Sequence, residues 1–432
     1  MIYSHLLKVR KALLLHKRYF TILCLTVLMA CGSVPELTKT PTLYLNQDYP
    51  TDAIPKLQQT TKPSLYYITD RLRSEKDTND EHYTSDRSPS MAFGKITIAF
   101  GDYASWADLV KSSNSVKRKT KYKMRITSTD ELVRFPPTPL AFTLQGGHIQ
   151  PVKDQAYLTY QNQKKQFQVT LSKLLKQANG KEAVLFIHGF KNEFDDAAYA
   201  LADVWHFSGR IGVPIFFTWP AGAKGLFGYF KDRESGEYSI YHLKETLRLI
   251  AATPGLEKIH IIAHSRGTDV ATTALRELII ETRAAGLSPR KKFKIETLIL
   301  AAPDLDFGVV RQRLIAERFG PAFGQINVYM NQNDSALGLA QKLMAGERFG
   351  RLTAEDIPKV DKGIFARISN VHFIDIENVH SLVGHDYFRS NPSVLSDIAL
   401  TLQTGAKPGE KDRPLQLVSG NFWRLQKNYP YN

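Results

Sequence analysis

A serine that could act as a nucleophile directly follows a short apolar run of the chain. Ser265 is the third residue of AHSRG (263–267), with apolar residues 259–263 leading into it and helical spacing following over 267–285. A serine between small residues at a strand-to-helix turn is the pattern of a nucleophile elbow, which displays Oγ above the sheet. Alanine replaces the usual first glycine here and still meets the need for a small side chain. Because a serine in this place can also simply cap the helix, other residues must decide its role.

A serine hydroxyl becomes an effective nucleophile when a histidine removes its proton and a carboxylate orients that histidine. In the elbow architecture these residues follow in the order serine, acid, histidine. Asp334 comes shortly after the apolar run 326–330, and His385 follows the later run 371–376. The sequence therefore predicts Ser265 as nucleophile, Asp334 as acid and His385 as base.

Two alternatives remain open for the acid, and one for the base. Asp304 and Asp306 also follow an apolar run, 297–302, so either could be the acid, although both could instead cap the next helix. His380 could replace His385 as the base. His372 lies inside a strand-like pattern, where we expect it to be packed.

Acyl transfer also needs donors for the negative charge that develops on the carbonyl oxygen. The backbone N–H of Arg266, directly after the serine, is the first candidate donor. The second is the backbone N–H of Phe190, in the loop that follows the apolar run 183–187. His188, in the same loop, is expected to support it structurally, and Asp269 to interact favourably with the helix dipole.

The elements that must hold these residues follow a strand–helix alternation from about residue 165, which predicts an α/β fold with a mostly parallel sheet. The strands are nearly continuous apolar runs, so helices are expected on both faces of the sheet. The site is expected at the carboxyl ends of the strands. The predicted strands are 183–187, 213–219, 259–263, 297–302, 326–330 and 371–376, and the predicted helices are 193–208, 239–252, 267–285 and 393–404.

Composition divides the chain into four predicted parts. Residues 1–30 are a signal peptide, and 31–60, rich in Pro, Thr and Gln, are a flexible tether. Residues 61–164 form a β-rich segment that packs on the core, with a polar loop at 74–90. Residues 165–432 form the catalytic domain.

The N-terminus indicates export and lipidation. Five Lys or Arg residues and no acidic residue precede a twelve-residue apolar run, 19–30, which is short of the roughly 20 residues that span a bilayer. The run ends in LMACG (28–32), which resembles a bacterial lipobox with Cys31 as the lipidated residue. An ordinary signal peptide or an uncleaved anchor is the alternative. We expect a lipid anchor in the bacterial cell envelope, at the periplasmic face of the outer membrane.

The chain has only two cysteines, Cys24 and Cys31, so the mature protein is expected to have no disulfide and no thiolate metal site. Its net charge of +15 is scattered, without a basic helix interleaved with aromatics and without a glycine-rich phosphate loop. We therefore expect no nucleic-acid partner, no cofactor and no metal.

Taken together, these motifs resemble an α/β-hydrolase, and more narrowly a bacterial esterase/lipase-like branch catalogued as a domain of unknown function. The resemblance covers about residues 65–400, and 67–71 and 93–96 are similar to the segment that precedes that branch's hydrolase core. It implies Ser265 as nucleophile, Asp334 as acid and His385 as base. The departures are Arg266, where many relatives have an apolar residue, and the long stretch after Asp334.

The expected activity is that of a lipid-anchored serine hydrolase, which cleaves a carboxylic (acyl) ester through an acyl-enzyme. The alternative is a hydrolase-fold lipoprotein without turnover that binds an envelope partner or lipid. Residues 221–238 and 338–366 could cover the site, and apolar side chains there would favour acyl-chain substrates.

Overall fold

The computed structural model describes residues 35–75, 82–102, 104–118, 120–223, 227–344, 346–376 and 385–431. The predicted signal peptide, the predicted lipidation site Cys31 and the alternative base His380 lie outside these ranges. None of the helices in the described ranges is long and apolar enough to cross a membrane.

A mixed sheet organises the described chain, in the strand order β12-β13-β11-β10-β9-β8-β6-β7-β1-β2-β3. Its central strands are parallel, as the predicted apolar runs require: β6 (Asn179–Ile187), β7 (Ile211–Thr218), β8 (Lys258–His264), β9 (Ile295–Ala301), β10 (Gln325–Met330) and β11 (Val371–Ile376). β13 (Phe422–Leu425) continues the parallel pairing, and β12 (Gln416–Ser419) closes that edge in antiparallel fashion. The predicted mostly parallel sheet is confirmed.

The N-terminal strands extend the same sheet at its other edge. β1 (Ser64–Arg73) pairs in parallel with β7, and β2 (Tyr83–Phe100) and β3 (Met124–Arg134) follow it in antiparallel order. Because β1 is hydrogen-bonded to a central strand, its side chains can reach the loops that follow the central strands.

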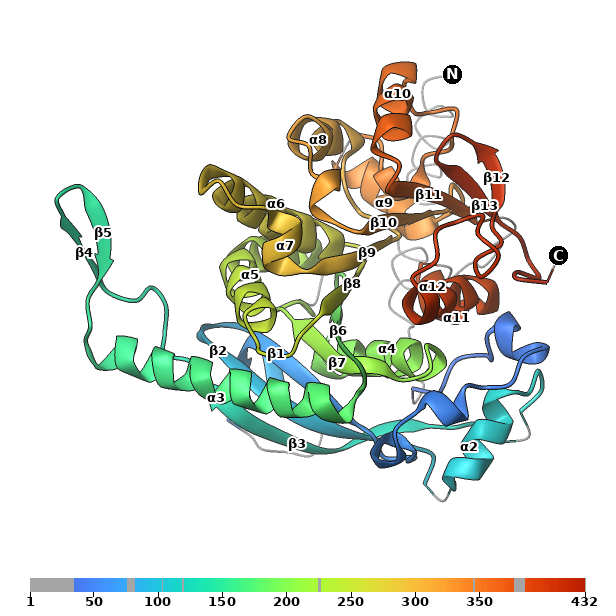
Figure 1. Cartoon of the computed structure of the whole chain (residues 1–432), viewed down its shortest axis with the longest axis horizontal. Helices are drawn as coiled ribbons and strands as arrows, with labels where there is room; N and C mark the ends of the chain where they lie inside the picture. The colour runs from blue at the N-terminus through green and yellow to red at the C-terminus, as the bar shows by residue number, and fades with distance from the viewer. Residues whose placement is uncertain are drawn as a thin grey trace, which may run out of the picture. The chain divides into compact units, whose positions relative to one another are not determined.

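Helices cover both faces of the sheet (Figure 1). Alternate residues of each central strand point to opposite sides. On one face they pack against α3 (Gln155–Gln177), α5 (Gly228–Ala251) and α6 (Gly267–Ala284), and on the other against α4 (Phe194–Phe207) and α12 (Pro392–Thr404). The shorter elements are α2 (Trp106–Ser113), α7 (Pro289–Phe293), α8 (Phe307–Val310), α9 (Ser335–Met344), α10 (Lys359–Ile368), α11 (Tyr387–Ser390), and a separate hairpin of β4 (Phe142–Gln145) and β5 (His148–Pro151).

The prediction of a flexible tether is wrong for residues 37–60, which pack onto the folded body. Tyr44 and Tyr49 are buried, and their hydroxyls donate to the carbonyls of Phe207 and His206 at the end of α4. The apolar residues of this segment have no regular spacing, because short 3-10 turns rather than a helix or strand present them to the body. A pattern search based on periodicity therefore misses them.

Three other boundaries differ from prediction. Residues 83–90, predicted as loop, form the first half of β2, and α5 begins at Gly228 rather than at residue 239. The added turns of α5 bury Asp232 and Ser235, which break the apolar periodicity on which the prediction depended. The predicted boundary at residue 165 falls inside α3.

Candidate active site

Ser265 occupies a tight turn between β8 and α6. Its φ of 52° lies in the left-handed region, which is costly for a residue with a side chain and is typical of a nucleophile elbow. The turn needs small neighbours: a Cβ on Gly267 would lie 2.2 Å from the carbonyl oxygen of His188, and one on Gly189 would lie 2.7 Å from Cβ of Ser265. The sequence pattern thus folds locally as expected.

The structure brings the three predicted residues into one hydrogen-bonded chain. Oγ of Ser265 lies 2.6 Å from Nε2 of His385, and Nδ1 of His385 lies 2.8 Å from Oδ2 of Asp334. A carboxylate can only accept here, so Nδ1 carries the proton and Nε2 is left to accept from the serine hydroxyl. This is the protonation pattern that a serine nucleophile with a general base requires.

Asp334 is held by the element that follows it. It lies directly before α9 and is almost fully buried, and its Oδ1 accepts from the N–H of Leu337 in the first turn of that helix. The cap fixes the carboxylate, so Oδ2 stays directed at His385.

The two alternative acids, Asp304 and Asp306, make hydrogen bonds to residues other than His385. Asp306 caps α8 by accepting from the N–H of Val309, and Asp304 accepts from the hydroxyl of Tyr229. Within the described ranges neither is hydrogen-bonded to His385, whose Nδ1 is taken by Asp334. His372 is buried in β11.

The two predicted oxyanion donors flank this chain. In the loop after β6, the N–H of Gly189 donates to Oδ1 of Asn192 and that of Lys191 donates to Oδ2 of Asp232. Across the described part of the chain, no protein acceptor takes the N–H of Phe190 or of Arg266. Within the described residues these two N–H groups thus lack a backbone acceptor, as an oxyanion donor must.

Two buried charged side chains, which the sequence analysis did not identify, are hydrogen-bonded to the backbone of the loop after β6. Arg71 of β1 donates to the carbonyls of Asn192 (2.8 Å) and Ala221 (2.9 Å), and Asp232 of α5 accepts from the N–H of Lys191 (2.9 Å) and Ala223 (3.0 Å). Burial lowers the pKa of Arg71 to about 10 and raises the pKa of Asp232. The available signal was weak: each is a charged residue within a segment that folds as strand or helix.

Two neutral histidines complete the surroundings. His188 accepts the N–H of Trp219 at Nε2, and its Nδ1–H donates to the carbonyl of Gly189, so it braces the loop as expected. His264, which the sequence did not single out, donates from Nε2 to the carbonyl oxygen of His385. Burial, followed by the charge of Arg71, lowers the pKa of His188 to about 3, and burial also holds the pKa of His264 well below its usual value.

These buried histidines make stability fall with acidity. Between pH 6.5 and 3 the His188 side chain is protonated in the unfolded chain but not in the folded chain. The free energy of unfolding therefore decreases as the pH drops below 6.5. We expect a slope of about 1.4 kcal/mol per pH unit from each such histidine. Urea unfolding between pH 7 and 5 measures it, and His188→Gln should reduce the slope by about that amount. An unchanged slope in the variant would contradict a neutral folded His188.

Arg266 and Asp269 form an ion pair beside the serine, with 2.7 Å between the guanidinium and the carboxylate. Asp269, predicted to interact with the helix dipole, thus also pairs with Arg266. The side chain of Arg266 is mostly buried. Within the described ranges, no group of three or more His, Cys, Asp or Glu residues is placed to hold a metal ion.

A mostly parallel sheet with a serine at the turn after a central strand, and with the acid and histidine after later strands, defines the α/β-hydrolase class. The chain belongs to the family described as alpha/beta hydrolase of unknown function (DUF900), whose model matches residues 163–403. No curated protein matches the chain. Family membership indicates a hydrolase. The match does not include β1, so Arg71, which supports the loop after β6, lies outside the matched residues.

Proposed function

We propose that the protein is a serine hydrolase that cleaves carboxylic ester bonds through an acyl-enzyme. The observation that carries the proposal is the unbroken hydrogen-bonded chain from Ser265 through His385 to Asp334. In a chain of this kind each residue has a distinct task, so the reaction can be written step by step.

Oγ of Ser265 attacks the ester carbonyl while Nε2 of His385 takes its proton, and Asp334 stabilises the imidazolium that forms. The N–H groups of Phe190 and Arg266 receive the oxyanion. Collapse of the tetrahedral intermediate expels the alcohol, which takes the proton from His385 and leaves the acyl group on the serine. Water, deprotonated by His385, then releases the acid and restores the serine.

The surroundings of the site support an acyl substrate. Tyr229 of α5 packs edge-on against Phe190, and the neighbouring Phe227 and Phe230 are exposed. α9, which starts directly after Asp334, exposes Leu339 and Leu343. The exposed residues of α5 and α9 belong to the two segments that were predicted to cover the site, and exposed apolar side chains there favour substrates with an apolar acyl chain.

The test of the function is labelling of the full chain by a fluorophosphonate probe, which reacts with activated serines. We expect labelling that disappears in Ser265→Ala and persists in the control Ser239→Ala, another buried serine. Absence of labelling in folded protein would contradict the hydrolase proposal and favour a scaffold that binds an envelope partner or lipid.

Lipidation at Cys31 and location in the bacterial envelope belong to the same proposal. The lipobox-like sequence at 28–32 supports it. Metabolic labelling with a fatty acid in a bacterial host should depend on Cys31 and be lost in Cys31→Ser, whereas Cys24→Ser should keep it.

The buried charges behind the oxyanion loop should control the rate rather than binding. We expect Arg71→Met and Asp232→Asn each to lower kcat for a reporter ester by about 10- to 100-fold with little change in KM, because small displacements of a donor are costly. Arg73→Met, on the same strand but exposed, is the matched control. A rise in KM at unchanged kcat would contradict a positioning role, and near-ultraviolet circular dichroism checks the fold.

A further inference from the structure

The β4–β5 hairpin projects from the folded body before the first turn of α3 (Figure 1). Its register pairs Phe142 with Pro151 and Leu144 with Ile149, so these four residues share one face. The other face carries Thr143, Gln145, His148 and Gln150. Phe142, Leu144 and Ile149 are 62%, 67% and 71% exposed, so the hairpin presents an apolar face to its surroundings.

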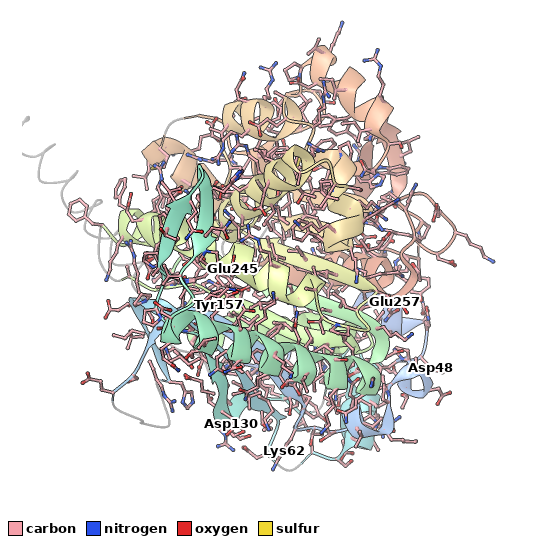
Figure 2. The ribbon with its side chains drawn as sticks, turned by 60° about the vertical axis from the view of Figure 1, so that its left-hand side comes forward. Asp48, Lys62, Asp130, Tyr157, Glu245 and Glu257 are labelled. Atoms are coloured by element: carbon pink, nitrogen blue, oxygen red, sulfur yellow. The ribbon has the colours of Figure 1, made fainter. Side chains whose placement is uncertain are left out.

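α3, which follows the hairpin in the chain, carries positive charge in its middle and C-terminal turns. The helix contains four lysines and no acidic residue. Lys165, Lys173 and Lys176 line one surface hollow together with Val169, and the spacing of these residues places them on a single side of the helix with exposed Leu158. Glu245, which contacts α3 through the hydroxyl of Tyr160, is already paired with Arg248. Figure 2 brings α3 and the hairpin to the front, with Tyr157 labelled near the start of the helix.

The hairpin lies toward the same end of the sheet as Ser265. α3 ends at Gln177 and β6 begins at Asn179, so the C-terminus of the helix lies beside the amino end of that strand. In its second half, Gln168 bonds the carbonyl of Ala252, at the end of α5 that is remote from the oxyanion loop. The N-terminus of α3, and the hairpin before it, therefore lie toward the carboxyl ends of the parallel strands.

We propose that the β4–β5 hairpin and the lysine-bearing side of α3 form a docking surface for a bilayer that contains anionic lipid. Exposed apolar side chains combined with a row of lysines are what an interfacial element needs, since the apolar residues enter the headgroup region and the lysines meet its negative charge. The alternative occupant, a second copy, is less suited, because a stable interface buries about 1,200 Å² or more and the apolar face of the hairpin has only four residues.

A bilayer that contacts both the hairpin and these lysines lies along the length of α3. The inference does not depend on catalysis by Ser265, because it concerns contacts made only by the hairpin and α3. Failure of either proposal would therefore leave the other intact.

The experiment places an environment-sensitive nitrobenzoxadiazole label on the hairpin of the full chain. Cys24→Ser and Cys31→Ser remove both native cysteines, and Leu144→Cys then provides one labelling site on the apolar face. Thr143→Cys, its neighbour on the polar face, is the matched control. On phosphatidylcholine vesicles that contain phosphatidylglycerol, we expect a blue-shifted, brighter emission at position 144 and little change at position 143.

The lysines are tested with the same label. Changing Lys165, Lys173 and Lys176 to Gln should weaken the response at position 144 by about fivefold for each lysine, since each is worth about 1 kcal/mol near an anionic surface. High salt should have the same effect.

Three results would overturn the proposal. The first is an equal response, or none, at positions 143 and 144. The second is a response that is the same on pure phosphatidylcholine and is unaffected by the lysine changes. The third is a change in emission that grows with protein concentration without vesicles, which would assign the hairpin to contacts between copies.

Discussion

Alanine at Ser265 or at His385 is expected to lower kcat for a reporter ester by about a millionfold, and the double variant to lose no more than either single variant. The two side chains act as one unit, since the 2.6 Å hydrogen bond between Oγ and Nε2 transfers the proton that makes the serine a nucleophile. Once either side chain is removed, the proton transfer cannot occur, so removal of the other causes no further loss of kcat. The remaining rate reflects only binding and the N–H groups of Phe190 and Arg266.

Steady-state hydrolysis of an activated ester by the four proteins of the double-mutant cycle measures this effect. His372→Asn, which changes a buried histidine of β11, is the control for general damage to the fold. A His385→Ala variant that kept kcat within about tenfold of the parent would contradict its role as base. His380, in a part of the chain outside the described ranges, would then be the residue to replace next.

The core of the fold could be predicted because its signals are local. Each central strand is a continuous apolar run, and each predicted site residue follows one of them, so chain order and strand polarity suffice to gather Ser265, Asp334 and His385 at one edge. The elbow could also be predicted, because the close approach of Gly267 to His188 demands a small residue in a fixed position.

The parts that escaped prediction depend on contacts between segments far apart in the sequence. Arg71 is recognisable as a support of the oxyanion loop only when β1 lies beside β7. From the sequence alone, Asp232 has the pattern of a surface charge. Its role becomes visible only in the structure, where three backbone N–H groups donate to its carboxylate. Likewise, Tyr44 and Tyr49 are buried by α4, and nothing in residues 37–60 themselves reveals this partner.

The hairpin shows the opposite case. Its alternating apolar and polar residues obey the period of a strand, but that period is usually evidence for a buried face. Here both faces of β4–β5 are exposed, so the alternation accompanies strand structure without burial of either face. An exposed apolar face on such a separate hairpin therefore points to a binding surface rather than to a contribution to the hydrophobic core.

Replacing Asp334 by asparagine is expected to lower kcat by about 10⁴-fold while leaving the fold intact. The carboxylate only accepts hydrogen bonds, which keeps the proton of His385 on Nδ1. An amide can donate its NH2 to Nδ1, so the imidazole shifts its proton to Nε2 and can no longer accept from Ser265. The amide oxygen in Asp334→Asn can still cap α9 at Leu337, so stability should change little.

The same substitution at Asp304 and Asp306 provides matched controls, because both were alternative acids and both keep an accepting oxygen when changed to asparagine. Asp306→Asn should retain the cap on Val309, and Asp304→Asn the bond from Tyr229, so we expect kcat within about tenfold of the parent for each. A collapse of kcat in either variant, with Asp334→Asn nearly unaffected, would move the acid to that residue. It would also require His385 to leave the carboxylate that lies 2.8 Å from its Nδ1. The three variants measured side by side thus decide which carboxylate orients the base.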